Sequence, residues 1–272
     1  METAPTATVL YDQGRAAGRA GAQGIVILDF GRPADSEATF GTIDFSGKFV
    51  PFSAIASGVE SYLRGYLLGA PAATRLDVAI GTNNSCGTGQ PCGGRICGCV
   101  AEPASFLAWG EAFASLVETV GSWTDSLVDR SGFTDVVQVV GADDAEPAYD
   151  PGFTNTYEVL SGFAERVGGP SPAMVDFGSA ESHYWTAQQL FEVAFGLAPD
   201  VPMPEIYFTD QVGEWTSLLR YARDRGTSVT VFGVLVDRTL GVDATSAYEA
   251  MQLAVAGSTG QRSIPWLSRM AN

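Results

Sequence analysis

The chain has few positive charges and almost no histidine. Among its 272 residues, 15 are Lys or Arg, 31 are Asp or Glu and one is His, which gives a net charge of −16. A charge of this sign repels the phosphate backbone and anionic lipids, so nucleic acid and membrane surfaces are disfavoured as partners. Lys48 is the one lysine, which leaves Schiff-base chemistry a single candidate in a Ser-Gly-Lys turn.

Long apolar runs are also missing. No run approaches the roughly 20 apolar residues that a membrane span needs, so we expect no membrane insertion. The first residues, Met-Glu-Thr-Ala-Pro-Thr-Ala, lack the basic region and apolar core of a signal peptide. We therefore expect a mature N-terminus with a start Met added.

Motifs of nucleotide-dependent and triad enzymes are absent from the sequence. The first expected strand ends in Asp29-Phe-Gly-Arg-Pro rather than in a glycine-rich phosphate loop. No Gly-x-Ser-x-Gly elbow is present, and the only histidine, His183, lies just past an expected strand, where a surface position is the simpler interpretation. We expect no cofactor and no Ser-His-Asp chemistry.

The four cysteines lie together in a glycine-rich segment, residues 85–100. Five, four and one residues separate consecutive cysteines, whereas zinc sites favour pairs two to four apart and often recruit histidine. We predict two disulfides, with zinc or free thiols as the alternatives, and a Cys97–Cys99 bridge as the most strained pairing. Disulfides imply a secreted protein. The residues concerned are Cys86, Cys92, Cys97 and Cys99.

Strand and helix patterns alternate along nearly the whole chain. This alternation predicts an all-parallel sheet with helices outside it, and the missing phosphate loop favours a TIM-like (β/α) barrel over a doubly wound sheet. We expect one domain over residues 1–272, with residues 7–11 as an eighth strand or an irregular barrel of seven. The expected strands are 24–31, 76–81, 135–142, 173–178, 205–208, 228–235 and 263–267, and the two longest expected helices are 53–68 and 105–127.

The strand near 135–142 runs directly into the acids Asp143, Asp144 and Glu146. Active sites of covered parallel sheets open at the carboxyl ends of the strands. Residues two apart on a strand share a face, so Asp144 and Glu146 project together while Asp143 points away. Such a pair lets one carboxyl stay protonated while the other stays ionised. The alternative is that these acids cap a turn and form salt bridges.

Other expected strand ends add acids, amides and aromatic rings. Carboxylates and amides bind sugar hydroxyls, aromatic rings stack on sugar faces, and paired carboxyls cleave glycosidic bonds, so the pattern points to a carbohydrate partner. A divalent cation on Asp29, Asp144, Glu146 and Asp176 is a rival interpretation, and core packing is the alternative for the tryptophans. The further residues are Asp29, Asn83, Asn84, Asp176, Tyr207 and Asp210, with Tyr149, Tyr184, Trp185 and Trp266 as the rings.

Three short motifs resemble one known family. Asp29 on the first strand, Asp144-Ala-Glu146 and Ile206-Tyr-Phe-Thr209 are similar to the barrel glycoside hydrolases of the family 25 muramidase type and their secreted glycoside-hydrolase-like relatives. The resemblance implies that Glu146 is the general acid, Asp144 its electrostatic partner and Asp29 a substrate-positioning carboxylate. The chain has Asp29-Phe-Gly31 where the family usually carries Asp-x-Ser.

The sequence therefore predicts a secreted glycan hydrolase that uses Glu146, with Asp144, Asp29 and Asp176 assisting. The alternative is a catalytically silent barrel that binds a glycan or a protein partner.

Overall fold

The structure is a computed structural model. It describes residues 6–71, 75–85, 91–92, 95–96, 104–131, 137–150, 152–236 and 241–269. The predicted disulfides lie outside the described side chains, because Cys86, Cys97 and Cys99 are not described and only the backbone of Cys92 is.

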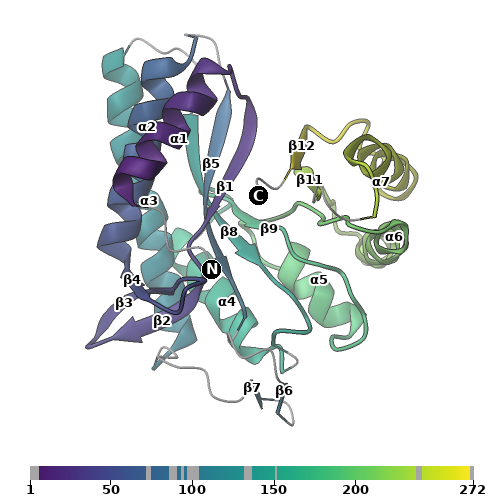
Figure 1. Ribbon diagram of the computed structural model, residues 1–272. Helices are drawn as coiled ribbons and strands as arrows, with labels where there is room; N and C mark the ends of the chain where they lie inside the picture. Colours follow the sequence, from purple (N-terminus) through teal and green to yellow (C-terminus); the bar gives the residue numbers. More distant parts are fainter. Residues whose placement is uncertain are drawn as a thin grey trace.

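In the described part of the chain, seven strands form the parallel framework (Figure 1). Five of them make one sheet in the order β1-β5-β8-β9-β10, and the other two pair with each other. The fold is thus the predicted α/β barrel in its irregular form with seven strands. The framework strands are β1 Gly24–Asp29, β5 Leu76–Asn83, β8 Val137–Asp144, β9 Met174–Asp176, β10 Asp200–Pro202, β11 Gly233–Val236 and β12 Trp266–Arg269.

Irregular hydrogen bonds connect the five-stranded sheet to β11. Phe232 donates its N–H to the Pro202 carbonyl at 2.7 Å, and Glu205 forms a single parallel bridge with Leu235. On the other side of the ring, the Trp266 side chain of β12 packs on Gly24 of β1, where a Cβ would lie 3.2 Å from the indole. The strands therefore follow one another around a common interior.

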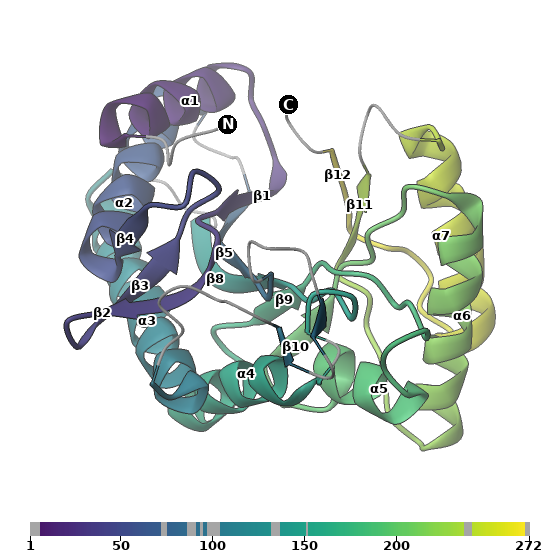
Figure 2. The ribbon, with the colours of Figure 1, turned by 60° about the horizontal axis from the view of Figure 1, so that its bottom comes forward.

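Helices surround the strands on the outside, and α2 to α7 succeed one another around the rim in Figure 2. In the described residues, no helix is both long and apolar enough to cross a bilayer. The helices are α1 Ala7–Arg19, α2 Phe52–Gly69, α3 Phe106–Ser131, α4 Thr154–Val167, α5 Ala187–Phe195, α6 Thr209–Asp224 and α7 Ala244–Thr259.

Helix α1 overturns the suggestion that residues 7–11 form an eighth strand. Thr6 caps its N-terminus by accepting a hydrogen bond from the Val9 N–H. Gly14 and Gly18 then let the α1 backbone approach α2 so closely that a Cβ would lie 2.0–2.2 Å from the Tyr62 and Tyr66 carbonyl oxygens. Packing against α2, rather than strand propensity, decides this segment.

The polar segment after β1 also forms structure that the sequence pattern did not predict. Strands β2 Arg32–Ser36, β3 Thr39–Ile43 and β4 Phe49–Pro51 make a small antiparallel sheet. The first hairpin turns through Glu37 and Ala38, both with positive φ. Such turns normally carry Asn or Gly, so the sequence held no turn signal here. The remaining strands, β6 Pro91–Cys92 and β7 Arg95–Ile96, form a short antiparallel pair.

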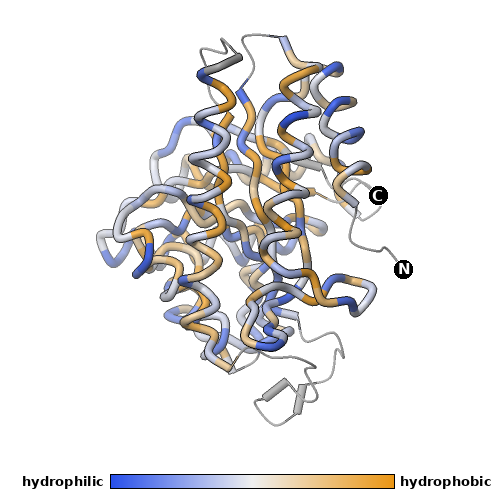
Figure 3. The backbone as a smooth tube through the Cα atoms, turned by 90° about the vertical axis from the view of Figure 1, so that its left-hand side faces the viewer, coloured by the Kyte–Doolittle hydropathy of each residue, from blue (hydrophilic) through white to orange (hydrophobic). Residues whose placement is uncertain are grey.

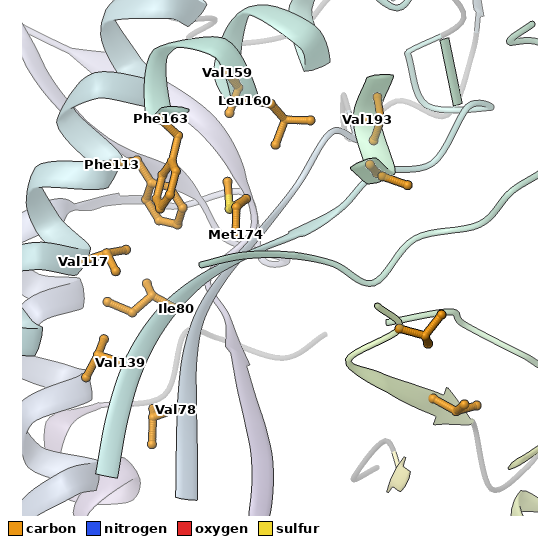
Figure 4. Close-up of a cluster of buried hydrophobic side chains, with 14 of the residues drawn as sticks. Val78, Ile80, Phe113, Val117, Val139, Val159, Leu160, Phe163, Met174 and Val193 are labelled. Atoms are coloured by element: carbon orange, nitrogen blue, oxygen red, sulfur yellow. The ribbon is translucent and has the colours of Figure 1, made fainter. Parts of the chain in front are cut away.

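Two apolar clusters lie on opposite faces of the strands. The cluster between strands and helices contains Ile80, Phe113, Phe163 and Met174, and Figure 4 shows these side chains between α3, α4 and the sheet. Apolar segments lie along the middle of the molecule in Figure 3, with hydrophilic ones mainly toward its edges. The second cluster fills the interior of the ring, which we call the lumen, with residues Ile25, Ala79, Val140, Ala142, Val175, Phe177, Met203 and Leu235.

The strand expected at 205–208 is replaced by β10, which lies slightly earlier in the chain. Only Glu205 forms a bridge, because the Gln211 side chain accepts the N–H groups of Tyr207 and Phe208 at 2.6 and 2.9 Å and caps α6. Those two N–H groups are then not available to a β-ladder.

Candidate active site

Strand alternation directs three polar side chains to the carboxyl end of the lumen. Ile25 on β1, Ala79 on β5 and Ala142 on β8 are lumen residues, so Asp29, Asn83 and Asp144, an even number of positions further on, point the same way. Asn83 and Asp144 are direct neighbours in the register, and the Asn83 amide donates to Asp29 Oδ2 at 3.4 Å. The structure thus brings these three predicted site residues together.

Three carboxyl groups meet at this end of the lumen. One carboxylate oxygen each from Asp144, Glu146 and Glu205 lies within 4.8 Å of the other two. Asp144 and Glu146 are partly exposed, whereas Glu205 is buried at 5% exposure. We call these three residues the acid site. Its first two members project together, as their spacing predicted, and the third was missed.

Hydrogen bonds hold the backbone and the side chain of Glu146. Asn84 accepts the Glu146 N–H and donates to the Glu146 carbonyl, both at 3.0 Å, and it also donates to Thr156 Oγ1 at 3.0 Å. The Asn84 amide, predicted to bind substrate, is thus occupied in positioning Glu146. The Ser179 hydroxyl donates to Glu146 Oε2 at 2.8 Å.

A tyrosine positions the Glu205 side chain through a hydrogen bond. The Tyr207 hydroxyl donates to Glu205 Oε1, and the Glu205 N–H lies 3.5 Å from the Gly178 carbonyl. Tyr207 therefore contacts the acid site through Glu205. A signal was present in the sequence, because Glu205 and Tyr207 are two residues apart, but the strand end was expected later, at Tyr207 to Asp210.

Burial, neighbouring charges and hydrogen bonds act differently on the pKa values of these acids. Burial raises the pKa of Asp144 well above its usual value, and the neighbouring carboxyls of Glu205, Glu146, Asp29 and Asp143 raise it further. Burial also raises the pKa of Glu146, but hydrogen bonds from Ser179 oppose that rise. At Asp29, burial raises the pKa against a 2.7 Å hydrogen bond from the Gly31 N–H.

Asp176, predicted to face the same site, points to the opposite side of the strand. Its neighbours Val175 and Phe177 belong to the lumen cluster, so Asp176 is directed toward the helices, next to Asp143 in the register. It is buried and accepts the Gly178 N–H at 3.1 Å. Asp176 therefore supports the fold beneath the acid site instead of facing a ligand in the lumen.

Burial of Asp176 predicts a stability that depends on pH. Burial, and next to it the charge of Glu146, raises the pKa of Asp176 from 3.8 to about 7 against the Gly178 hydrogen bond. A raised pKa means that the folded protein binds the proton more tightly, so the free energy of unfolding falls as pH rises from about 4 through about 7. The fall from this group alone amounts to at most about 4 kcal/mol.

We expect Asp176→Asn to weaken this dependence, because asparagine still accepts the Gly178 hydrogen bond but does not ionise. Urea unfolding at pH 5 and pH 8 measures the change in the free energy of unfolding between the two pH values. Exposed Asp125→Asn is the matched control. Buried Asp143 and partly buried Asp200 retain part of the effect, because burial raises the pKa of both. An equal loss of stability in the wild type and in Asp176→Asn would contradict the expectation.

The predicted rings divide into exposed and buried groups. Tyr149 and Tyr184 are each 41% exposed, and the Tyr149 pKa is raised by burial and by the charges of Asp144, Glu146 and Glu205. Trp185 is fully buried and donates its indole N–H to the Asp150 carbonyl at 2.7 Å, so it packs in the core and cannot stack on a sugar here.

Two other predicted residues lie away from the acid site. Trp266 packs at the amino ends of the strands, with Arg75 over its ring and Gly24 beside it. Asp210 is exposed in the first turn of α6.

A separate pocket lies beside the ends of β5 and β8, between β2, α3 and α4. Arg32, Asp143, Asp150 and Thr156 are among its lining residues, and no member of the acid site lines it. Asp150 accepts hydrogen bonds from the N–H and hydroxyl of Thr156 at 3.0 and 2.9 Å. This pocket borders the hydrogen bonds that position Glu146.

Oxygen atoms in this arrangement also suit a hard cation. The four acids considered from the sequence do not converge, since Asp176 faces the helices. In the acid site, Glu146 and Glu205 already accept hydrogen bonds from Ser179 and Tyr207. We therefore do not assign these residues as metal ligands.

No protein-family model and no curated protein matches this chain. Among solved structures, the chain is similar to a hyperthermostable endo-1,4-beta-D-mannanase from Thermotoga petrophila RKU-1, solved with maltose and glycerol. The two are 12% identical with a TM-score of 0.45, and the match covers 97% of this chain and 85% of the mannanase chain. A likeness of this degree does not bear on the substrate, and the muramidase resemblance stays a prediction.

Proposed function

We propose that the protein hydrolyses a glycosidic bond at the acid site, with Asp144 and Glu146 as the catalytic carboxyls. The observation that carries the proposal is the convergence of Asp144, Glu146 and Glu205 within 4.8 Å at the carboxyl end of the lumen. Acids packed this closely do not ionise together, so at least one keeps its proton near neutral pH. A protonated acid beside an ionised one is the pair that glycoside hydrolysis requires.

The surroundings of the pair suit a sugar. Tyr149 is exposed next to the carboxyls and offers a ring for stacking, and Asp29 can accept hydrogen bonds from hydroxyl groups. Retaining enzymes place their carboxyls about 5–5.5 Å apart, and inverting enzymes about 6.5–9.5 Å apart. The close approach of Asp144 to Glu146 favours retention. We also propose that the protein is secreted, on the ground of its clustered cysteines.

A glycan panel tests the proposal. Wild-type protein is incubated with bacterial cell-wall and plant glycans, and both binding and new reducing ends are scored, with and without a chelator. We expect cleavage of at least one glycan that also binds, unaffected by chelation. Exposed Glu165→Gln, which removes a charge far from the lumen, serves as the control and is expected to cleave like the wild type.

Other outcomes of the panel separate the alternatives. Binding without cleavage would favour the catalytically silent barrel. Activity lost on chelation alone would move the carboxyls to a metal-dependent reaction, because direct acid/base hydrolysis needs no cation.

A further inference from the structure

We propose that Asp144 is the proton donor of the acid site and that Glu146 is its ionised partner. These roles are the reverse of those that the muramidase resemblance implies. The inference rests on the proposed function and decides which carboxyl carries the proton. It comes from counting the hydrogen-bond donors around each group.

Glu146 accepts a hydrogen bond from a neighbouring side chain. The Ser179 hydroxyl donates to Oε2 at 2.8 Å, and Ser179 lowers the pKa of Glu146 against the effect of burial. Ser179 reaches this position because Gly178 lies against Ala145, where a Cβ would be 2.3 Å from the Ala145 carbonyl oxygen. Donors directed at a carboxylate stabilise its charged form.

Asp144 has the opposite environment. Its Oδ1 atom is buried and has no hydrogen-bond partner among the described residues. The charged groups that act on it are all carboxyls, namely those of Glu205, Glu146, Asp29 and Asp143. A carboxyl with a buried oxygen atom that has no donor, and with like charges beside it, favours its neutral form. Asp144 is therefore the group that holds a proton.

This assignment gives a balanced hydrolysis. The Asp144 proton passes to the glycosidic oxygen as the bond from the anomeric carbon to that oxygen breaks, and the bond electrons stay with the departing oxygen. The ionised Glu146 faces the positive charge that develops at the anomeric carbon. Water then bonds to that carbon and returns a proton to Asp144.

Carbon-13 NMR titration of the Asp and Glu carboxyl carbons tests the assignment without any substrate. Resonances are assigned by their loss in Asp144→Asn and in Glu146→Gln. We expect Glu146 to titrate at a lower pH than Asp144. The opposite order would overturn the inference and would leave the proposed function untouched.

Ser179→Ala is a second test that keeps both carboxyls in place. Losing a hydrogen bond to a charged group is expected to raise the titration midpoint of Glu146 by about one pH unit or more. Exposed Ser182→Ala, three residues away, makes the same chemical change and is expected to leave the midpoint unchanged. An unmoved midpoint in Ser179→Ala would show that the donors do not hold the charge on Glu146.

Kinetics on aryl glycosides of the cleaved sugar adds a third readout. A leaving phenol that is already acidic needs no proton, so Asp144→Asn should keep its turnover there and lose it on the natural glycan. Glu146→Gln should lose both. Turnover of aryl glycosides by Glu146→Gln but not by Asp144→Asn would instead make Glu146 the acid. No cleavage by the wild type would reject only the proposed function, because the titration still shows which carboxyl carries the proton.

Discussion

Turnover of the cleaved glycan is expected to fall by about 10²- to 10⁴-fold when Glu146 is replaced by glutamine or Asp144 by asparagine. Each amide keeps the shape of the side chain but neither carries the charge nor delivers the proton. The stability should rise in both variants, because each replacement removes a partly buried carboxyl whose pKa is raised by burial and by neighbouring acids. Reducing-end release and thermal unfolding, measured on the same preparations, check both parts.

The expected fall in turnover and the expected rise in stability together distinguish a catalytic residue from a structural one. A structural residue loses activity and stability together, whereas a catalytic acid in a repulsive cluster loses activity and gains stability. Exposed Glu165→Gln should change neither quantity. Full activity in Glu146→Gln, or gross unfolding of that variant, would show that Glu146 is structural.

Gly110→Ala is expected to cost about 3 kcal/mol or more in the free energy of unfolding. A Cβ at Gly110 of α3 would lie 2.1 Å from the Val159 carbonyl oxygen of α4, so the two helix backbones must separate. Gly162 of α4 packs equally closely on the Leu107 carbonyl, at 2.0 Å. The gain in helix propensity, about 1 kcal/mol, cannot offset this clash.

Gly121→Ala is the matched control on the same helix. A Cβ there would meet only the Val139 Cβ at 4.0 Å, so the propensity gain should appear as up to about 1 kcal/mol of added stability. Urea unfolding of both variants makes the comparison. A small loss in Gly110→Ala, similar to the change in Gly121→Ala, would contradict the close packing of α3 on α4.

The periodicity of the sequence predicted much of the framework. Six of the seven parallel strands, the helices that follow them and the shared direction of Asp144 and Glu146 follow from apolar runs and from the two-residue repeat of a strand. These features are local, so a single sequence carries them. The three-residue strand β10 was missed because prolines flank and end it, at Pro199 and Pro202.

The composition of the site depends on contacts that are distant in sequence. Glu205 joins the acid site across 59 positions from Glu146, and no local pattern reports that distance. Trp185 lies in a segment that looked like a loop, yet its indole N–H finds the Asp150 carbonyl and the ring is buried. Asp176 was assigned to the wrong face because the strand end alone does not specify which way a single acid points.

The central claim is that Asp144 and Glu146 together cleave a glycan, and the double variant Asp144→Asn, Glu146→Gln tests it most directly. Reducing ends are measured for the wild type and the double variant, at equal concentrations of folded protein, on a glycan that both proteins bind. The account predicts cleavage by the wild type and none by the double variant. Equal cleavage by both proteins would contradict it.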